Sequence, residues 1–176
     1  RTTMGIRESK DLAEIVKKIK EMYGKDIEIG LLGYSMGAAT VCMATQYLQD
    51  DVKFVISDCS YSSLANQCFS ACRIYHVPFG LTSWFINIEF RIRFGISYRD
   101  CKVKEVLSNS KLPICIFHGK KDKKVFPKNA DTLYNESTSK IKRLHYFEGA
   151  GHAECVEIDP VSYKEKVKEF IESIGE

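Results

Sequence analysis

The most constraining feature of this chain is a serine between two glycines, at a point where a strand pattern gives way to a helix pattern. Residues 26–29 alternate charged and apolar side chains, and residues 30–37 continue as Gly-Leu-Leu-Gly-Tyr-Ser-Met-Gly. The alternation predicts a strand, and the small residues that follow suit a tightly packed helix. Gly33-x-Ser35-x-Gly37 is therefore the pattern of a nucleophile elbow, a tight turn that holds a serine Oγ clear of the backbone.

The glycines of this motif have a steric role. We expect Ser35 to adopt a strained backbone conformation, and a Cβ at position 33 or 37 to crowd the neighbouring strand and helix. The helix begins directly after Ser35, so its positive end favours an oxyanion near the hydroxyl. The motif alone also fits a glycine-rich turn with a buried, inert serine, so other residues must decide.

Two later segments each end an apolar run with a residue that can serve a serine. Residues 113–117 read Pro-Ile-Cys-Ile-Phe and lead through His118 and Gly119 to Asp122. Residues 144–151 end in Glu-Gly-Ala-Gly and lead to His152. Because the carboxyl ends of parallel strands meet at one edge of a sheet, we expect an acid and a base to lie near Ser35 there.

With these three motifs, in the order serine, aspartate, histidine, the chain resembles the C-terminal two-thirds of an α/β-hydrolase. The wording Gly-Tyr-Ser-Met-Gly-Ala-Ala-Thr, and Ser-Asp-Cys-Ser-Tyr-Ser-Ser at 57–63, is similar to bacterial hydrolases related to serine peptidases and dienelactone-hydrolase-like esterases. The resemblance implies an α/β fold with a mostly parallel sheet flanked by helices. It also implies a catalytic triad of Ser35, Asp122 and His152 that needs no cofactor and no metal.

The remaining periodicity agrees with alternating strands and helices. Apolar side chains at helical spacing predict a helix over 5–23, and further helices are expected over 128–138 and 161–174. Asp159 is the expected N-cap of the last helix and Pro160 its first residue. A strand is predicted over 52–57. Such alternation favours a parallel sheet within one domain, residues 1–176.

The segment 61–98 interrupts this alternation. Seven aromatic residues lie between positions 69 and 94 of this segment, and Pro78 and Gly80 are expected to break two helical stretches. In an α/β-hydrolase an insertion at this place commonly forms a helical cap over the site, so the resemblance implies a cap in which Trp84 and Phe85 contact substrate. The alternative is that these aromatic side chains form ordinary packing between helices.

Only one helix and one strand precede Ser35, whereas an α/β-hydrolase has several strands before its nucleophile. We therefore expect the N-terminal strands to be absent from this chain, which would be part of a longer protein or a shortened descendant of one. The loop that donates the second oxyanion-hole N–H belongs to that part, and Met36 supplies the first. The nucleophile strand would then have a bare edge that pairs with the missing N-terminal segment or with a second chain.

Other candidate residues compete with these assignments. Asp58 follows a predicted strand, and some α/β-hydrolases take their acid from that position, so it is the alternative to Asp122. We expect His118 to support the loop of Asp122, His145 to be structural and His76 to lie on the surface.

Composition excludes several classes of partner. The net charge is only +3, from 26 basic and 23 acidic residues that alternate, which argues against nucleic-acid binding. No apolar run reaches the roughly 18 residues of a membrane span, so we expect no membrane contact. The seven cysteines are an odd number and predict reduced, buried thiols in a cytoplasmic protein. Cys68 and Cys72 share a helix face but lack further metal-ligand spacing, so no metal site is expected.

The function that these residues predict is acyl transfer from a small-molecule ester or a peptide-like substrate to Ser35. A carboxylesterase is the first choice, although peptidases and thioesterases share every motif. The alternative is a non-catalytic hydrolase-like module that binds a ligand or partner.

Overall fold

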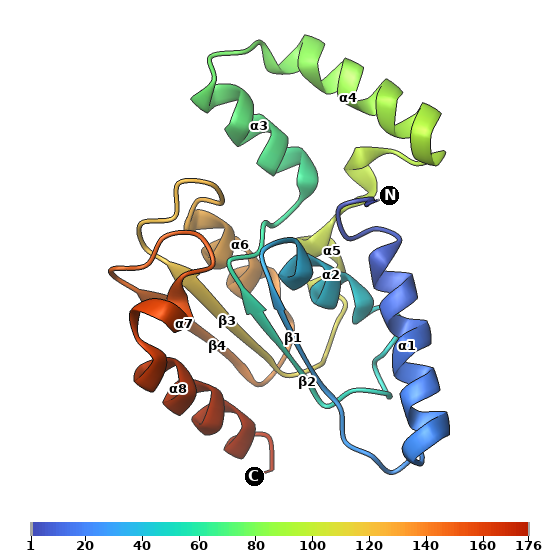
Figure 1. Cartoon of the computed structure of the whole chain (residues 1–176), viewed down its shortest axis with the longest axis vertical. Helices are drawn as coiled ribbons and strands as arrows, with labels where there is room; N and C mark the ends of the chain where they lie inside the picture. Colours follow the sequence, from blue (N-terminus) through green and yellow to red (C-terminus); the bar gives the residue numbers. More distant parts are fainter. Residues whose placement is uncertain (1, 176) are drawn as a thin grey trace.

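The computed structural model describes residues 2–175 and has a four-stranded parallel sheet at its centre (Figure 1). The strands lie in sequence order, and every pair of neighbours is parallel. The strands are β1 (Gly30–Tyr34), β2 (Phe54–Asp58), β3 (Ile114–Gly119) and β4 (Lys142–Phe147). The predicted α/β fold class is confirmed, and all four carboxyl ends meet at one edge of the sheet, as parallel pairing requires.

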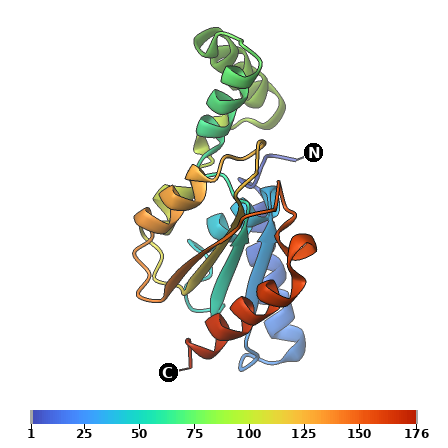
Figure 2. The same ribbon diagram turned by 90° about the vertical axis from the view of Figure 1, so that its left-hand side faces the viewer.

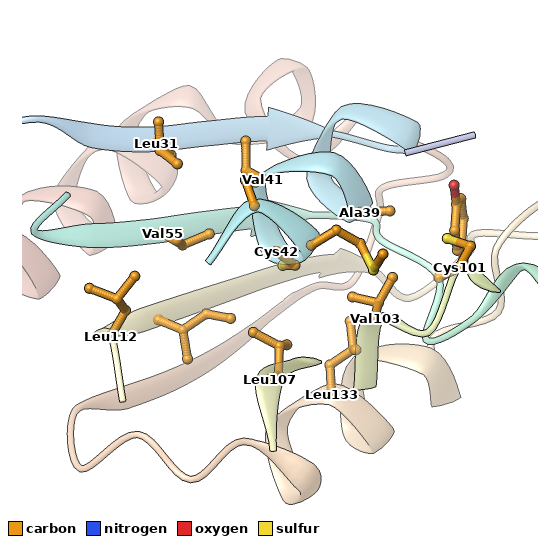
Figure 3. Packing of buried hydrophobic residues seen from close by; sticks show 14 of the residues in the cluster. Leu31, Ala39, Val41, Cys42, Val55, Cys101, Val103, Leu107, Leu112 and Leu133 are labelled. Carbon is orange, nitrogen blue, oxygen red and sulfur yellow. The ribbon is translucent and has the colours of Figure 1, made fainter. Parts of the chain in front are cut away.

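Helices cover both faces of the sheet. On one face lie α2 (Met36–Ala44), α5 (Val103–Leu107) and α6 (Lys128–Glu136), with α1 (Glu8–Tyr23) packed on α2; on the other lie α7 (Cys155–Ile158) and α8 (Pro160–Glu172). Figure 3 shows the first core, in which Leu31 and Val55 of the sheet meet Val41, Leu107 and Leu133 of the helices. Because both faces of the sheet are covered, its central strands read as nearly continuous apolar runs.

The second core lies between the sheet and α8. Ile56 and Phe117 of the central strands are buried there with Phe147, Tyr163 and Phe170. The rings of Phe117 and Tyr163 lie 4.5 Å apart between centroids. This aromatic contact fixes β3 against α8, and with it the loop that carries Asp122.

Two predicted boundaries can be compared directly. The strand expected from residue 26 begins at Gly30, because residues 26–29 precede the ladder with β2. The start of α8 is confirmed: Asp159 accepts the N–H of Ser162, and Pro160 is the first residue of the helix.

The segment after β2 forms two helices, α3 (Leu64–Ile74) and α4 (Phe79–Phe94), followed by the short 3-10 helix η1 (Tyr98–Asp100). Figures 1 and 2 show α3 and α4 projecting beyond the carboxyl edge of the sheet, away from the body of the molecule. Pro78 precedes α4, as expected, but Gly80 lies inside that helix and does not break it. The helix can run through Gly80 because glycine only lowers helix propensity, by about 1 kcal/mol.

The edge strand β1 pairs with β2 alone within the part of the chain described. The carbonyl of Ile29 and the N–H of Ser35 bond to the β2 side, so the two-residue period turns the backbone of Leu32 and Tyr34 outward. Both of these side chains are also exposed. Across residues 2–175, no helix combines the length and the apolarity that crossing a membrane would require.

Candidate active site

The turn after β1 has the strained geometry expected of an elbow. Ser35 has φ 54° and ψ −117°, and its N–H donates to the Asp58 carbonyl at 2.8 Å. A Cβ on Gly33 would lie 2.3 Å from the Gly37 carbonyl oxygen, so only glycine fits there. The same expectation for Gly37 is wrong, because a Cβ at that position meets no atom within 4 Å.

Ser35, His152 and Asp122 come together at the carboxyl edge of the sheet. Ser35 Oγ lies 2.7 Å from His152 Nε2, and His152 Nδ1 lies 2.7 Å from Asp122 Oδ2. Asp122 selects the tautomer in which Nδ1 carries the proton, which leaves Nε2 to accept the serine hydrogen. The three residues come from the loops after β1, β3 and β4 and form a continuous hydrogen-bonded chain.

Asp122 is held by its own loop. Its Oδ1 accepts the N–H groups of Lys124 and Val125 at 2.8 and 2.9 Å. His118 Nε2 lies 2.8 Å from the Val125 carbonyl oxygen and 3.4 Å from Asp122 Oδ2, so it supports this loop from below. Burial alone would raise the pKa of Asp122, but hydrogen bonds from His118, His152 and the Val125 N–H outweigh it and hold that pKa well below its usual range. Asp122 is therefore ionised beside the imidazole.

Asp58, the alternative candidate for the acid of the triad, is not hydrogen-bonded to His152. It is fully buried, and neither of its carboxylate oxygens has a hydrogen-bond partner among the described residues. Burial raises the pKa of Asp58. The imidazole of His152 contacts Asp122 and makes no hydrogen bond to Asp58.

The helix α2 starts at Met36, directly after the serine. The first N–H groups of a helix have no partner within it, so the Met36 N–H and the positive end of α2 lie beside Ser35. This arrangement suits the stabilisation of negative charge on a substrate oxygen.

A cavity of about 670 Å³ lies between α3 and α6, close to the loop of Asp122. Its lining residues are Ser62, Asn66, Phe69, Ser70, Arg73, Ile74, Phe126, Lys128, Asn129 and Thr132. The side-chain amide of Gln67 donates to the Lys124 carbonyl and so ties α3 to that loop. Trp84 and Phe85, which were expected to contact substrate, are 57% exposed on α4 and do not line this cavity.

The aromatic walls of the cavity are not among the residues predicted from the sequence. Phe69 is one of seven aromatic residues between positions 69 and 94, and Phe126 lies in a lysine-rich loop that gives no apolar pattern. Residues on α3 that face α6 could have been found from their spacing at 66, 69–70 and 73, which places them on one helix face.

Comparison with known proteins agrees with this architecture. Residues 90–159 match a family described as serine aminopeptidase, S33. The uncharacterized protein YqkD of Bacillus subtilis (strain 168) is 25% identical, with the alignment covering 99% of this chain and 58% of that protein.

Solved structures give the same fold. The esterase Pf2001 of Pyrococcus furiosus superposes with a TM-score of 0.71 at 23% identity, over 98% of this chain and 64% of the esterase. The acylaminoacyl peptidase of Pyrococcus horikoshii gives 0.68 at 18% identity, over 96% of this chain and 27% of the peptidase. The chain therefore has the α/β-hydrolase fold. It spans less than two-thirds of the length of YqkD and of Pf2001.

Proposed function

We propose that this chain carries the catalytic residues of a serine hydrolase that cleaves esters through an acyl-enzyme on Ser35. The observation that supports this most is the pair of 2.7 Å contacts from Ser35 Oγ to His152 and from His152 to Asp122. A serine hydroxyl is a weak nucleophile unless a positioned base takes its proton, and a third group must orient that base.

The proposed reaction has two halves. In the first, Ser35 Oγ attacks the carbonyl carbon while His152 Nε2 takes the hydroxyl proton, and the imidazolium then gives that proton to the leaving alcohol. In the second, water loses a proton to His152 and attacks the acyl-serine, which releases the acid and restores the hydroxyl. Asp122 remains ionised throughout and stabilises the imidazolium, because its hydrogen bonds hold it in that state.

The Met36 N–H is the proposed first donor to the oxyanion in both halves. One such donor is worth about 10²–10³ in rate in other serine enzymes. The second donor would come from a segment that covers the free edge of β1, either N-terminal to this chain or from a second chain.

Carboxylesters are the favoured substrate class. An alkoxide leaves a tetrahedral intermediate more readily than an amine, so ester cleavage needs less stabilisation from the site than amide cleavage does. One of the solved structures with this fold is also an esterase. Phe69, Ile74 and Phe126 give the cavity between α3 and α6 an apolar wall that suits an acyl or aromatic group, although no triad residue lines this cavity. Thioesters and amides remain the alternative substrates for the same triad.

A fluorophosphonate probe tests this proposal. It should label the folded protein at Ser35, with the modified peptide identified by mass spectrometry, and the Ser35→Ala variant should not be labelled. His152→Ala, which keeps the hydroxyl but removes the base, should lose most of the labelling rate. A folded protein that the probe leaves unlabelled would favour the non-catalytic alternative, a module that binds through the exposed edge of β1.

A further inference from the structure

A second cluster of reactive groups lies behind the triad, on the α8 side of the sheet. It consists of Asp58 at the end of β2, Cys59 directly after it, and Cys155 at the start of α7. All three residues are fully buried, and the two Sγ atoms lie 4.0 Å apart. We propose that these three residues bind a thiophilic divalent cation, with zinc as the best match.

The geometry fits such an ion. One ligand atom from each of the three residues lies within 4.8 Å of the other two. An equilateral triangle with sides between 4.0 and 4.8 Å has its centre about 2.3–2.8 Å from each corner. Zinc bonds thiolate sulfur at about 2.3 Å and carboxylate oxygen at about 2.0–2.2 Å, so a small contraction would supply three of the four ligands that zinc takes. A disulfide would need the sulfur atoms to approach to about 2.05 Å instead.

The carboxylate of Asp58 gives an independent indication that a cation binds here. Both of its oxygens are buried and lack a hydrogen-bond partner among residues 2–175, and a charge in that state is costly. The neighbouring hydroxyl of Tyr163 is also buried without a partner. A cation between Asp58 and the two thiols would satisfy the carboxylate directly.

A competing trio of Cys59, His118 and Asp122 also has the required spacing. Asp122, however, already accepts hydrogen bonds from His152 and from two backbone N–H groups. His118 Nε2 is likewise engaged with the Val125 carbonyl. The trio with the unpartnered carboxylate is therefore the better site.

Binding would exchange protons for the ion. The hydrogen bond with Cys59, together with burial and the neighbouring Asp58, raises the pKa of the Cys155 thiol. Coordination as a bis-thiolate releases the two thiol protons to solvent, and the divalent cation balances the two new charges. The site then carries one net negative charge, no more than ionised Asp58 alone.

The bound ion would also hold the loop of His152. Cys155 follows His152 by three residues, and the Ala153 N–H donates to Cys59 Sγ at 3.4 Å. The cation would thus link the end of β2 to the segment that carries the base. Its role is structural, since none of the three ligands touches the Ser35 hydroxyl.

A cobalt titration of the reduced, chelator-treated protein tests the site, with the ion added both to folded protein and during refolding. We expect a thiolate-to-cobalt charge-transfer band at one equivalent, which zinc displaces, and a zinc content near one per chain by elemental analysis. Cys155→Ser and Asp58→Asn should weaken binding at least tenfold. Cys42→Ser is the matched control, because Cys42 is equally buried but outside the cluster.

The readout is independent of catalysis, so Ser35→Ala should bind the ion as wild type does, whether or not the chain is a hydrolase. Absence of the cobalt band in both protocols overturns the proposal, and so does a band that persists in Cys155→Ser. Should Cys155→Ser fail to fold, Asp58→Asn and the wild-type titration still decide the question.

Discussion

The triad and the aromatic side chains on the projecting helix α4 differ sharply in how they are held. Asp122 accepts hydrogen bonds from two backbone N–H groups and an imidazole, and it is fully buried. The rings of Trp84 and Phe85 on α4 meet edge to face, 4.9 Å apart between centroids, but both residues are 57% exposed. The body of the molecule, which is the sheet with the helices on its two faces, thus holds the triad with several hydrogen bonds, whereas Trp84 and Phe85 on the projecting pair α3–α4 are largely exposed to solvent.

This difference separates two kinds of property. A group held by several short hydrogen bonds loses its function when one partner is removed, because the partner cannot be replaced by water. Exposed aromatic side chains on a projecting helix can be changed at little cost in stability, so they tune what binds rather than what reacts. The predictions below test whether chemistry belongs to the body and selectivity to α3–α4.

The largest effect is expected from the nucleophile and its base. Ser35→Ala and His152→Ala should each reduce kcat for a p-nitrophenyl ester by about 10⁶, as in other serine enzymes where the triad acts as a unit. The assay is steady-state hydrolysis, with the melting temperature as the control for folding. Residual activity within tenfold of wild type in Ser35→Ala would remove Ser35 from the mechanism.

The orienting acid comes next. Asp122→Asn should lower kcat by about 10⁴, because the amide favours the wrong imidazole tautomer. Asp58→Asn is the comparison, and it should leave kcat within about tenfold because Asp58 makes no hydrogen bond to His152. If the two variants exchanged behaviour, the acid would be Asp58.

The sequence could predict the body better than the projecting helices for the same physical reason. The elbow depends on local sterics at Gly33, and the loops of Asp122 and His152 follow apolar strands, so short motifs were sufficient. The start of β1 was placed too early because alternation at 26–29 does not reveal where the partner strand begins.

The cavity could not be predicted, because it depends on how α3 lies against α6, a long-range packing that no local pattern encodes. The prediction that a Cβ at Gly37 would clash is wrong for a similar reason. The five-residue motif predicts the turn, but it does not show which atoms of the rest of the chain pack against it. The unpartnered carboxylate of Asp58 is likewise visible only after β2, β3 and α8 have been packed together.

The exposed edge of β1 allows a test of whether the isolated chain is sufficient for full catalytic activity. We expect the 176-residue chain alone to turn over an ester about 10²–10³-fold more slowly than a protein in which a further segment pairs with β1 and donates a second N–H to the oxyanion. The exposed Leu32 should also promote self-association of the isolated chain, and Leu32→Lys should reduce it. A monomeric 176-residue chain with undiminished activity would contradict this expectation.

Smaller effects are expected from α3 and α4. Phe69 lines the cavity, and its ring meets that of Phe79 edge to face at 5.2 Å between centroids. Phe69→Ala should therefore change the preference between short and long acyl chains by several-fold in kcat/KM. Trp84→Ala and Phe85→Ala should alter selectivity more than stability, with less than about 1 kcal/mol lost on unfolding because both side chains are exposed. A loss of several kcal/mol with unchanged selectivity would make these aromatic residues part of a core instead.

The smallest effect concerns acid stability, which should reside in the body because the segment 61–98 contains only one carboxylate, Glu89. Burial alone would raise the pKa of Glu8, but hydrogen bonds from Thr3, with a smaller one from Thr2, outweigh burial and lower that pKa to about 2. A depressed pKa means that Glu8 stabilises the fold above its ordinary value of 4.5 and that this contribution fades as the pH falls towards about 2.

Glu8→Gln should therefore lower the melting temperature at pH 7 by about 2–4 °C, the shift that losing about 1 kcal/mol gives in a chain of this size. The gap between wild type and variant should close between pH 4.5 and about 2 in circular dichroism melts. Glu14→Gln is the matched control, since Glu14 lies on the same helix in an exposed pair with Lys17. A gap that stays constant down to the lowest pH at which the protein folds would show that the hydrogen bonds of Glu8 to the N-terminal residues do not depend on its charge.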